Sequence, residues 1–183
     1  MRAPPEPVRD GFDAMRILDT ERLRLRQLVE SDAAFILRLL NEPSFLRNIG
    51  DRGVRTLAGA ERYLRDGAIA SYRTHGYGLY LVELRQSAQP IGMCGLVRRD
   101  YLDAADIGFA FLPEFWSQGY ASESAAAVLA YAFESLALPR VLAIVAPGNT
   151  GSIRVLEKLG LVPKGTIRPP GAVSDVQLFA SDA

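Results

Sequence analysis

The 183-residue sequence is poor in the side chains on which most metal and disulfide chemistry depends. It has one cysteine, Cys94, and one histidine, His75. A single cysteine excludes an intramolecular disulfide and a cysteine-based zinc site, and it is typical of proteins from a reducing compartment. A single histidine argues against a Ser-His-Asp triad and a two-histidine metal site. We therefore expect a cytoplasmic protein without a metal.

Net charge and long apolar runs are also missing. The 21 Lys and Arg residues balance the 21 Asp and Glu residues, which leaves no overall field to attract nucleic acid or an anionic membrane. The longest apolar stretches, such as 107–113, are too short to span a bilayer. The first residues carry prolines and charges where a secretion signal needs an apolar run. The sequence predicts no nucleic-acid partner and no membrane partner.

The hydrophobic pattern predicts a single domain after a mobile tail. Residues 1–16 are rich in proline and charge, whereas residues 17–183 show periodicity and hold no linker long enough to divide them. Apolar residues at helical spacing predict helices over about 33–40, 57–73, 119–136 and 150–159. Short apolar or alternating runs predict strands over about 23–26, 79–84, 91–97, 107–112 and 141–145, and two more between 161 and 179. Short turns in the middle favour antiparallel pairing, so we expect an α+β fold with a mixed, mostly antiparallel sheet flanked by helices.

The segment 111–123 is the strongest candidate for a binding site. An apolar strand ends at Pro113, and the small residues Gly119 and Ala121 begin the longest helix. Small residues let a ligand approach the backbone, and the unpaired N–H groups of a first helical turn favour an anion such as a pyrophosphate. Ser122 could add a hydroxyl. The alternative is that the small residues only let this helix pack closely on the sheet.

Several motifs occur in an order that resembles a known family. They are Arg22-Leu23-Arg24-Leu25-Arg26, Asp106-Ile107-Gly108, the run 113–123, Asn149-Thr150-Gly151-Ser152 and the run 156–161. Together they resemble the GNAT (GCN5-related N-acetyltransferase) superfamily, in its ribosomal-protein-alanine acetyltransferase (RimJ/RimL-type) branch, over about residues 17–180. The resemblance implies a GNAT-like fold, acetyl-CoA as co-substrate without a metal, and acetyl transfer to an amine.

The resemblance also implies which residues hold acetyl-CoA. In the family, the loop before the long helix wraps the pyrophosphate, and the preceding strand bulges near its end and receives the pantetheine arm. The start of the following helix binds the pantetheine or the amine. The matching residues here are Phe111, Leu112, Trp116, Ser117, Gln118, Gly119, Tyr120, Ala121, Ser122, Asn149 and Ser152. An N–H near Phe111 would polarise the thioester carbonyl. As alternatives, Asn149 is a good helix N-cap, and Phe111 and Leu112 suit a core strand.

The catalytic residues are less well defined by the resemblance. The tyrosine that many members use as general acid falls at Leu156, so Ser152 or a water would protonate the leaving thiolate, and a thiol pKa near 8.5 makes this step undemanding. Asp106 occupies the family's acidic strand position and could take the proton of the amine, directly or through water; the alternative is a surface aspartate that opens a strand. Position alone suggests that the acceptor opening includes His75, Tyr77 and Arg99.

The sequence thus predicts an acetyl-CoA-dependent N-acetyltransferase that works by direct transfer. The acceptor would be a primary amine of a protein N-terminus, an amino acid or a small molecule, selected by the loops around 48–55, 73–77 and 98–105. Cys94 lies in an apolar run and is expected in the core rather than as an acetyl-carrying nucleophile. The alternative, favoured by Leu156, is a weak or inactive GNAT-like module that binds a CoA ester for regulation or scaffolding. Exposed strand edges could also pair two copies into a homodimer.

Overall fold

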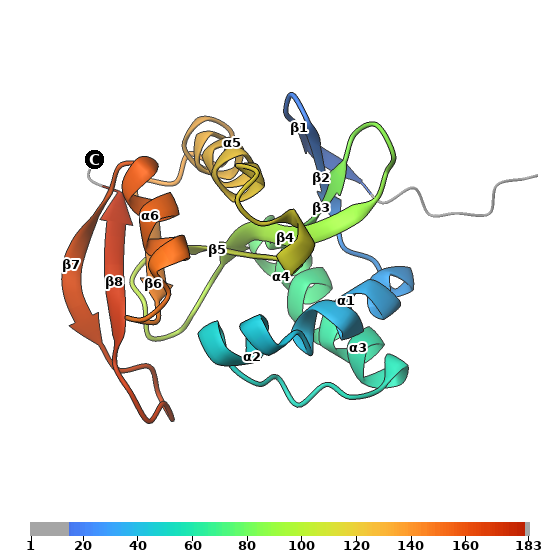
Figure 1. The fold of residues 1–183 in the computed structure, drawn as a ribbon. Coiled ribbons are helices and arrows are strands. Elements are labelled where there is room, and N and C mark those ends of the chain that lie inside the picture. The colour runs from blue at the N-terminus through green and yellow to red at the C-terminus, as the bar shows by residue number, and fades with distance from the viewer. Residues whose placement is uncertain (1–14, 182–183) are drawn as a thin grey trace, which may run out of the picture.

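The computed structural model describes residues 15–181, so residues 1–14 of the predicted tail lie outside the described residues. Within this range one eight-stranded sheet has the order β1-β2-β3-β4-β5-β6-β8-β7 (Figure 1). The strands are β1 (Arg16–Asp19), β2 (Leu23–Gln27), β3 (Leu79–Leu84), β4 (Pro90–Val97), β5 (Asp106–Phe111), β6 (Leu142–Val145), β7 (Leu161–Ile167) and β8 (Val176–Ser181). The helices are η1 (Glu30–Asp32), α1 (Ala33–Leu40), α2 (Pro43–Asn48), α3 (Leu57–Leu64), η2 (Arg65–Ile69), α4 (Ala70–His75), η3 (Pro113–Phe115), α5 (Tyr120–Glu134) and α6 (Thr150–Lys158).

The sheet is mixed and mostly antiparallel, as predicted, and it splits at its one parallel pair. Neighbouring strands are antiparallel except β5 and β6. These two strands pair at a single position, Asp106 with Leu142. Beyond this position, β5 continues to Phe111 and β6 to Val145, but the two strands no longer pair with each other. The sheet therefore opens toward the carboxyl ends of β5 and β6.

Helices cover both faces of the sheet, and alternating side chains of the strands supply a core to each (Figure 1). On one face, Val128 of α5 and Leu156 of α6 pack with Ile107 of β5. On the other face, Ile36 of α1 and Leu64 of α3 belong to a second cluster. Both cores fix β5 from the two sides and so set the position of the split.

The structure has an α-helix, α2, that the sequence did not predict. The helix predicted over about 33–40 is present as α1, which ends at Leu40. Pro43, however, begins α2. Proline suits a first helical turn because its missing N–H would have no partner there. The predicted helix over 57–73 is present as the continuous series α3, η2 and α4, in which η2 is a π-helical turn.

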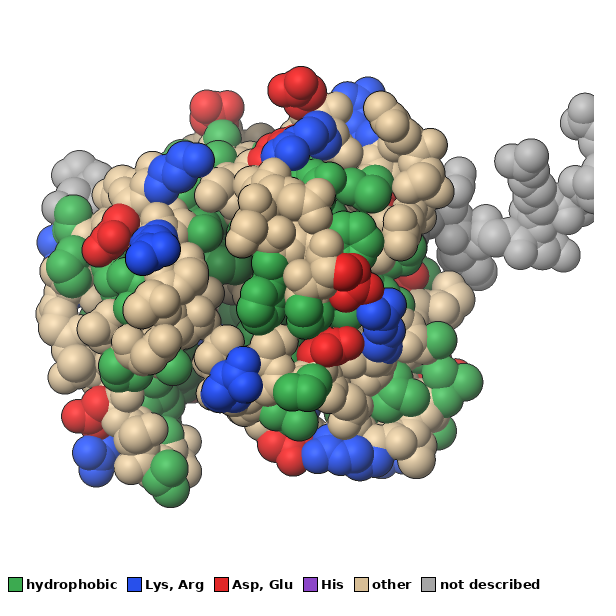
Figure 2. All heavy atoms as spheres, viewed as in Figure 1, with side chains coloured by type: hydrophobic (Ala, Val, Ile, Leu, Met, Phe, Trp, Pro, Cys, Tyr) green, Lys and Arg blue, Asp and Glu red, His purple; other side chains and the backbone are tan. Residues whose placement is uncertain are grey.

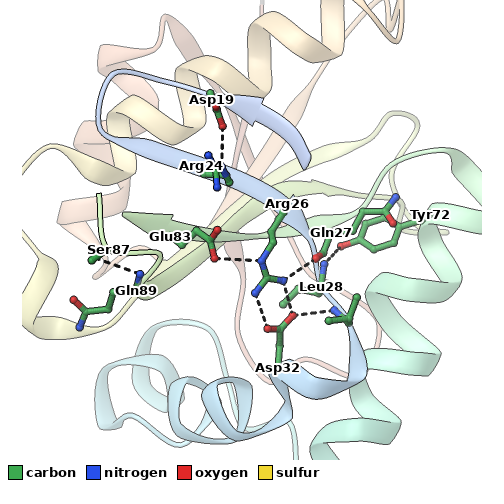
Figure 3. Close-up of polar contacts among 11 residues, drawn as sticks. Asp19, Arg24, Arg26, Gln27, Leu28, Asp32, Tyr72, Glu83, Ser87 and Gln89 are labelled. Atoms are coloured by element: carbon green, nitrogen blue, oxygen red, sulfur yellow. Dashed lines mark hydrogen bonds and ion pairs between the residues drawn. The ribbon is translucent and has the colours of Figure 1, made fainter. Parts of the chain in front are cut away.

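A charged cluster ties β2 to β3 and to the start of α1 (Figure 3). The Arg26 guanidinium donates to both Asp32 carboxylate oxygens, at 2.9 and 2.8 Å, and to Glu83 Oε2 at 3.2 Å. Asp32 Oδ2 also accepts the Val29 N–H at 2.9 Å. The side chains of Arg26, Asp32 and Glu83 are largely buried, with exposed fractions of 18, 9 and 8%. Because buried charges are costly unless they are paired, this cluster holds β2 and α1 in one arrangement.

Candidate active site

A cleft of about 570 Å³ opens where the sheet splits. Its walls come from α2, from the end of β5 and the segment that follows it, and from the start of α6. The space-filling view shows the surface hollowed between the part formed by α6 and the part formed by α2 (Figure 2). Nine of the predicted acetyl-CoA residues line the cleft: Phe111, Trp116, Ser117, Gly119, Tyr120, Ala121, Ser122, Asn149 and Ser152.

The loop before α5 has a strained backbone and presents the end of a long helix. Gly119, at φ +83°, is the N-cap residue of α5 and has no side chain to satisfy the N–H groups of the first turn. Ser117 has φ +59°, in the left-handed region that glycine adopts more easily. The Trp116 indole N–H donates to the Phe111 carbonyl at 2.9 Å and ties the loop to β5. The unpaired N–H groups of this 15-residue helix make its N-terminus an anion-binding end.

Arg22, in the turn before β2, holds this loop from outside. Its guanidinium donates to the Gln118 carbonyl at 2.9 Å and to Glu123 at 2.7 Å, and it lies 4.5 Å from the Tyr120 ring centroid. Glu123 also accepts the Thr20 hydroxyl at 2.6 Å and the Arg22 N–H at 2.9 Å. Burial disfavours the charge of Glu123, but these hydrogen bonds outweigh it and keep its pKa below the usual value. The sequence reading missed Arg22 in this role because Glu123 lies 101 positions further along the chain.

The outer part of β5 has backbone groups that no strand uses. Its register with β4 runs without a shift over Asp106–Phe111, so the expected bulge is wrong for these residues. The Leu112 N–H donates to the Ile91 carbonyl of β4 at 3.0 Å. Because backbone groups alternate between the two edges of a strand, Phe109 and Phe111 direct theirs away from β4 and toward the split. An extended chain could pair with this edge.

The start of α6 forms the opposite wall. Asn149 Oδ1 accepts the Ser152 N–H at 3.2 Å, so Asn149 is the N-cap of α6 and also lines the cleft. The Ser152 hydroxyl makes no hydrogen bond to another residue in the range 15–181. Leu156 is 1% exposed and belongs to the core, so it brings no proton donor to the cleft.

The other predicted site residues do not line the cleft. Leu112 is buried in the core on the α1 side, and Gln118 is exposed, with its amide N–H donating to a backbone carbonyl. Tyr77 is buried, and its ring centroid lies 5.8 Å from that of the exposed His75. Arg99 forms an ion pair with Asp106 at 2.9 Å. The role of His75, Tyr77 and Arg99 at the acceptor opening stays a prediction.

Asp106 is buried behind the cleft, on the strand that lines it. It is 1% exposed, and burial raises its pKa to about 6 even though Arg99 favours the charged form. By strand alternation Asp106 shares one face of β5 with Gly108 and Ala110, and Ala110 lines the cleft about 13 Å away along the strand. Gly108 leaves this face open, because a Cβ placed there would meet only Leu79, at 3.8 Å. The buried Asp106 carboxylate thus lies on the same strand face as a residue that lines the cleft, with no side chain of β5 between Asp106 and Ala110.

Cys94, the one cysteine of the sequence, does not line the cleft. Cys94 is fully buried in β4, and burial raises the pKa of its thiol to about 12, so little thiolate exists near neutral pH.

In the part of the chain that the structure describes, no three His, Cys, Asp or Glu side chains gather as a metal site would require. None of the helices over 15–181 has the length and apolar character needed to cross a membrane.

A mixed, mostly antiparallel sheet flanked by helices, with an anion-binding helix end beside its last β5 residues, fits the GNAT-like fold that the motifs predict. Residues 22–162 match the family model described as the acetyltransferase (GNAT) domain. The chain therefore belongs to the GNAT family and is an N-acetyltransferase. This outcome confirms both the family and the fold class predicted from the motifs.

Relatives and solved structures agree with this assignment. In Bacillus subtilis (strain 168), the protein named uncharacterized protein YkkB is 33% identical, over 86% of this chain and 91% of its own. In the same strain, uncharacterized N-acetyltransferase YoaA is 30% identical, over 83% of this chain and 86% of its own. The structure of RimL, a ribosomal L7/L12 alpha-N-protein acetyltransferase in complex with coenzyme A, has a TM-score of 0.76 at 20% identity. The match covers 90% of this chain and 96% of RimL, and it shows a shared fold.

Proposed function

We propose that the chain binds acetyl-CoA in this cleft and transfers the acetyl group directly to a primary amine of a small molecule or a peptide. The observation that carries the proposal is the meeting of the anion-binding end of α5, the free edge of β5 and the start of α6 around one cleft. These parts have the charge preference and the backbone donors that a long phosphorylated thioester requires. The solved structure of RimL with coenzyme A supports the same ligand class.

The residues present fit acetyl-CoA, which supplies an activated acetyl thioester when it is bound. The first-turn N–H groups of α5, at Tyr120 to Ser122, would hold the pyrophosphate. The backbone N–H and carbonyl of Phe109 and the N–H of Phe111 would pair with the amides of the pantetheine arm, as an added strand pairs with a sheet edge, while the Phe111 carbonyl already accepts the Trp116 indole N–H. One of these N–H groups would also stabilise negative charge on the thioester oxygen.

Proton transfer has one candidate on each side of the reaction. Asp106, with a pKa of about 6, would be ionised near neutral pH and would accept the proton of the amine through a chain of waters along the β5 face that it shares with Gly108 and Ala110. Ser152 lines the cleft with an unbonded hydroxyl and would donate a proton to the leaving thiolate. This donor would replace the tyrosine that Leu156 cannot supply. The cytoplasmic location and the homodimer stay predictions.

The test is thioester turnover by the purified full chain. Release of the CoA thiol from acetyl-CoA would be followed with a panel of primary amines, and product acetylation would be confirmed by mass spectrometry. Turnover of at least one amine by wild type, and nearly unchanged turnover by Cys94→Ala, supports direct transfer. Binding of acetyl-CoA without turnover of any amine would contradict the proposal and favour a binding module. Complete loss of activity in Cys94→Ala would instead indicate a covalent acetyl intermediate.

A further inference from the structure

The cleft has an uneven distribution of charge. Among its described lining residues, Arg47 and Arg154 are the charged side chains, and no carboxylate is present. Both arginines are exposed, and neither forms an ion pair or a side-chain hydrogen bond with another residue in the range 15–181. Figure 2 shows basic side chains on both sides of the hollow between α6 and α2. The cleft is thus prepared to receive negative charge.

Four carboxylates on or near the elements around the cleft are already paired with other arginines. Each lies 2.5–3.7 Å from a guanidinium nitrogen. The pairs are Glu42 and Glu114 with Arg38, Asp51 with Arg55, and Asp106 with Arg99. Glu157 of α6 forms no ion pair within residues 15–181 and lies three residues from Arg154, whereas α2 carries no carboxylate, so the charge of Arg47 in particular is available to a ligand.

The two arginines stand on different walls and so can serve different ligands. Arg154 shares α6 with Ser152 and follows Asn149, within the wall expected to hold acetyl-CoA. It is placed to meet a phosphate of that ligand. Arg47 stands on α2, next to the cleft residues Asn48 and Ile49, and α2 contributes no residue to the predicted acetyl-CoA set. Arg47 is therefore the cation left for the acceptor.

We propose that the acceptor amine carries a carboxylate and that Arg47 binds it. The inference rests on the proposed function and names its substrate class: a free amino acid, or a peptide whose N-terminal segment is acidic. The planar guanidinium matches a carboxylate with two parallel hydrogen bonds. A polyamine or an aminoglycoside would instead bring further positive charge to a cleft whose described lining offers no carboxylate to receive it.

The test compares acceptors that differ only in one charge. The value of kcat/KM would be measured with amino acids and their amides, with dipeptides such as Ala-Asp and Ala-Asn in C-terminally amidated form, and with spermidine. The expected result is a preference of about tenfold or more for the carboxylate member of a pair. Preference within the amino-acid pairs identifies the free amino acid, and preference within the dipeptide pairs identifies the acidic peptide.

Variants then locate the effect. Arg47→Gln should lower kcat/KM about tenfold or more for the carboxylate acceptor and less than about twofold for its amide, with the acetyl-CoA Kd unchanged. Arg47→Lys keeps the charge but loses the paired geometry and should fall between. Arg62→Gln, which changes an exposed arginine of α3 outside the cleft, is the matched control.

Three outcomes would overturn the inference, and they are distinguishable. Equal turnover of both members of each pair, or preferred turnover of spermidine, would refute the acceptor class and leave the acetyltransferase proposal standing. A raised acetyl-CoA Kd in Arg47→Gln would assign Arg47 to the co-substrate instead. Turnover of no amine at all would remove the proposed function and this inference together.

Discussion

The buried Asp106 carboxylate should make the protein less stable at neutral pH than at mildly acidic pH. Burial raises its pKa from the ordinary 3.8 to about 6, against the effect of the ion pair with Arg99. Between these two values the folded state holds the proton and the unfolded chain does not. The resulting stabilisation is fully present below about pH 3.8 and is lost as the pH rises through about 6. The difference in pKa corresponds to about 3 kcal/mol.

Asp106→Asn isolates this contribution. The free energy of unfolding would be measured by urea denaturation of both proteins from pH 4.5 to 7.5, and the difference between them cancels the other titrating groups. The stability of the variant relative to wild type should rise with pH across this range, by as much as about 3 kcal/mol over the full titration. The Arg99 side chain is 26% exposed, so water can solvate its charge when the partner is lost. Parallel pH profiles of the two proteins would refute the raised pKa.

The same variant tests the proposed role of Asp106 as general base. Asp106→Asn should lower kcat, and the deficit should be largest between about pH 6, above which Asp106 is ionised, and the pKa of the amine, because the amine is still protonated there and needs a base. As the pH approaches the pKa of the amine, more free amine is present and the deficit should shrink. A deficit that stays constant across pH would make Asp106 a structural residue.

Three further substitutions test the surroundings of the cleft. Gly119→Val places a branched side chain at φ +83° and a Cβ 3.2 Å from the Arg22 guanidinium, so the KM for acetyl-CoA should rise about tenfold or more; an unchanged KM would remove the loop from the site. Glu123→Gln should lower the free energy of unfolding in urea by about 1 kcal/mol at pH 7. The loss should become smaller as the pH falls and Glu123 takes up a proton, because a lowered pKa contributes stability only while the group is ionised. A loss that persists unchanged at low pH would argue against a charge effect. Arg26→Ala leaves two buried carboxylates without their cation and should cost about 3–5 kcal/mol, whereas a loss below about 1 kcal/mol would contradict the importance of that cluster.

The sequence predicted well those features that depend on neighbouring residues. The amphipathic spacing over 150–159 and the cap at Asn149 are local, and the structure has α6 at Thr150–Lys158 with that cap formed. The apolar runs of the middle strands are equally local, and β3 covers the predicted 79–84. The small residues at Gly119 and Ala121 likewise pointed to the start of α5, since the reason lies in the backbone of those residues themselves.

Features that join distant segments could not be read in the same way. Arg22 lies in a motif that carried the family resemblance, but its contact with Gln118 and Glu123 depends on how β2 and α5 meet in the fold. The position of α2 at the cleft depends on the packing of α1 and α2 against the sheet, so Arg47 carried no signal in the sequence. Asp106 was correctly placed at the start of a strand, while its pairing with Arg99 depends on the loop between β4 and β5.

Calorimetric titration of the purified protein with acetyl-CoA is the most direct test of the central claim, with CoA and NAD as comparators. The account predicts micromolar binding of acetyl-CoA and CoA and no comparable binding of NAD, because the loop and the β5 edge suit a pantetheine pyrophosphate. Gly119→Val should weaken the same binding. Absence of binding for both CoA species would contradict the account of the cleft and leave only the fold.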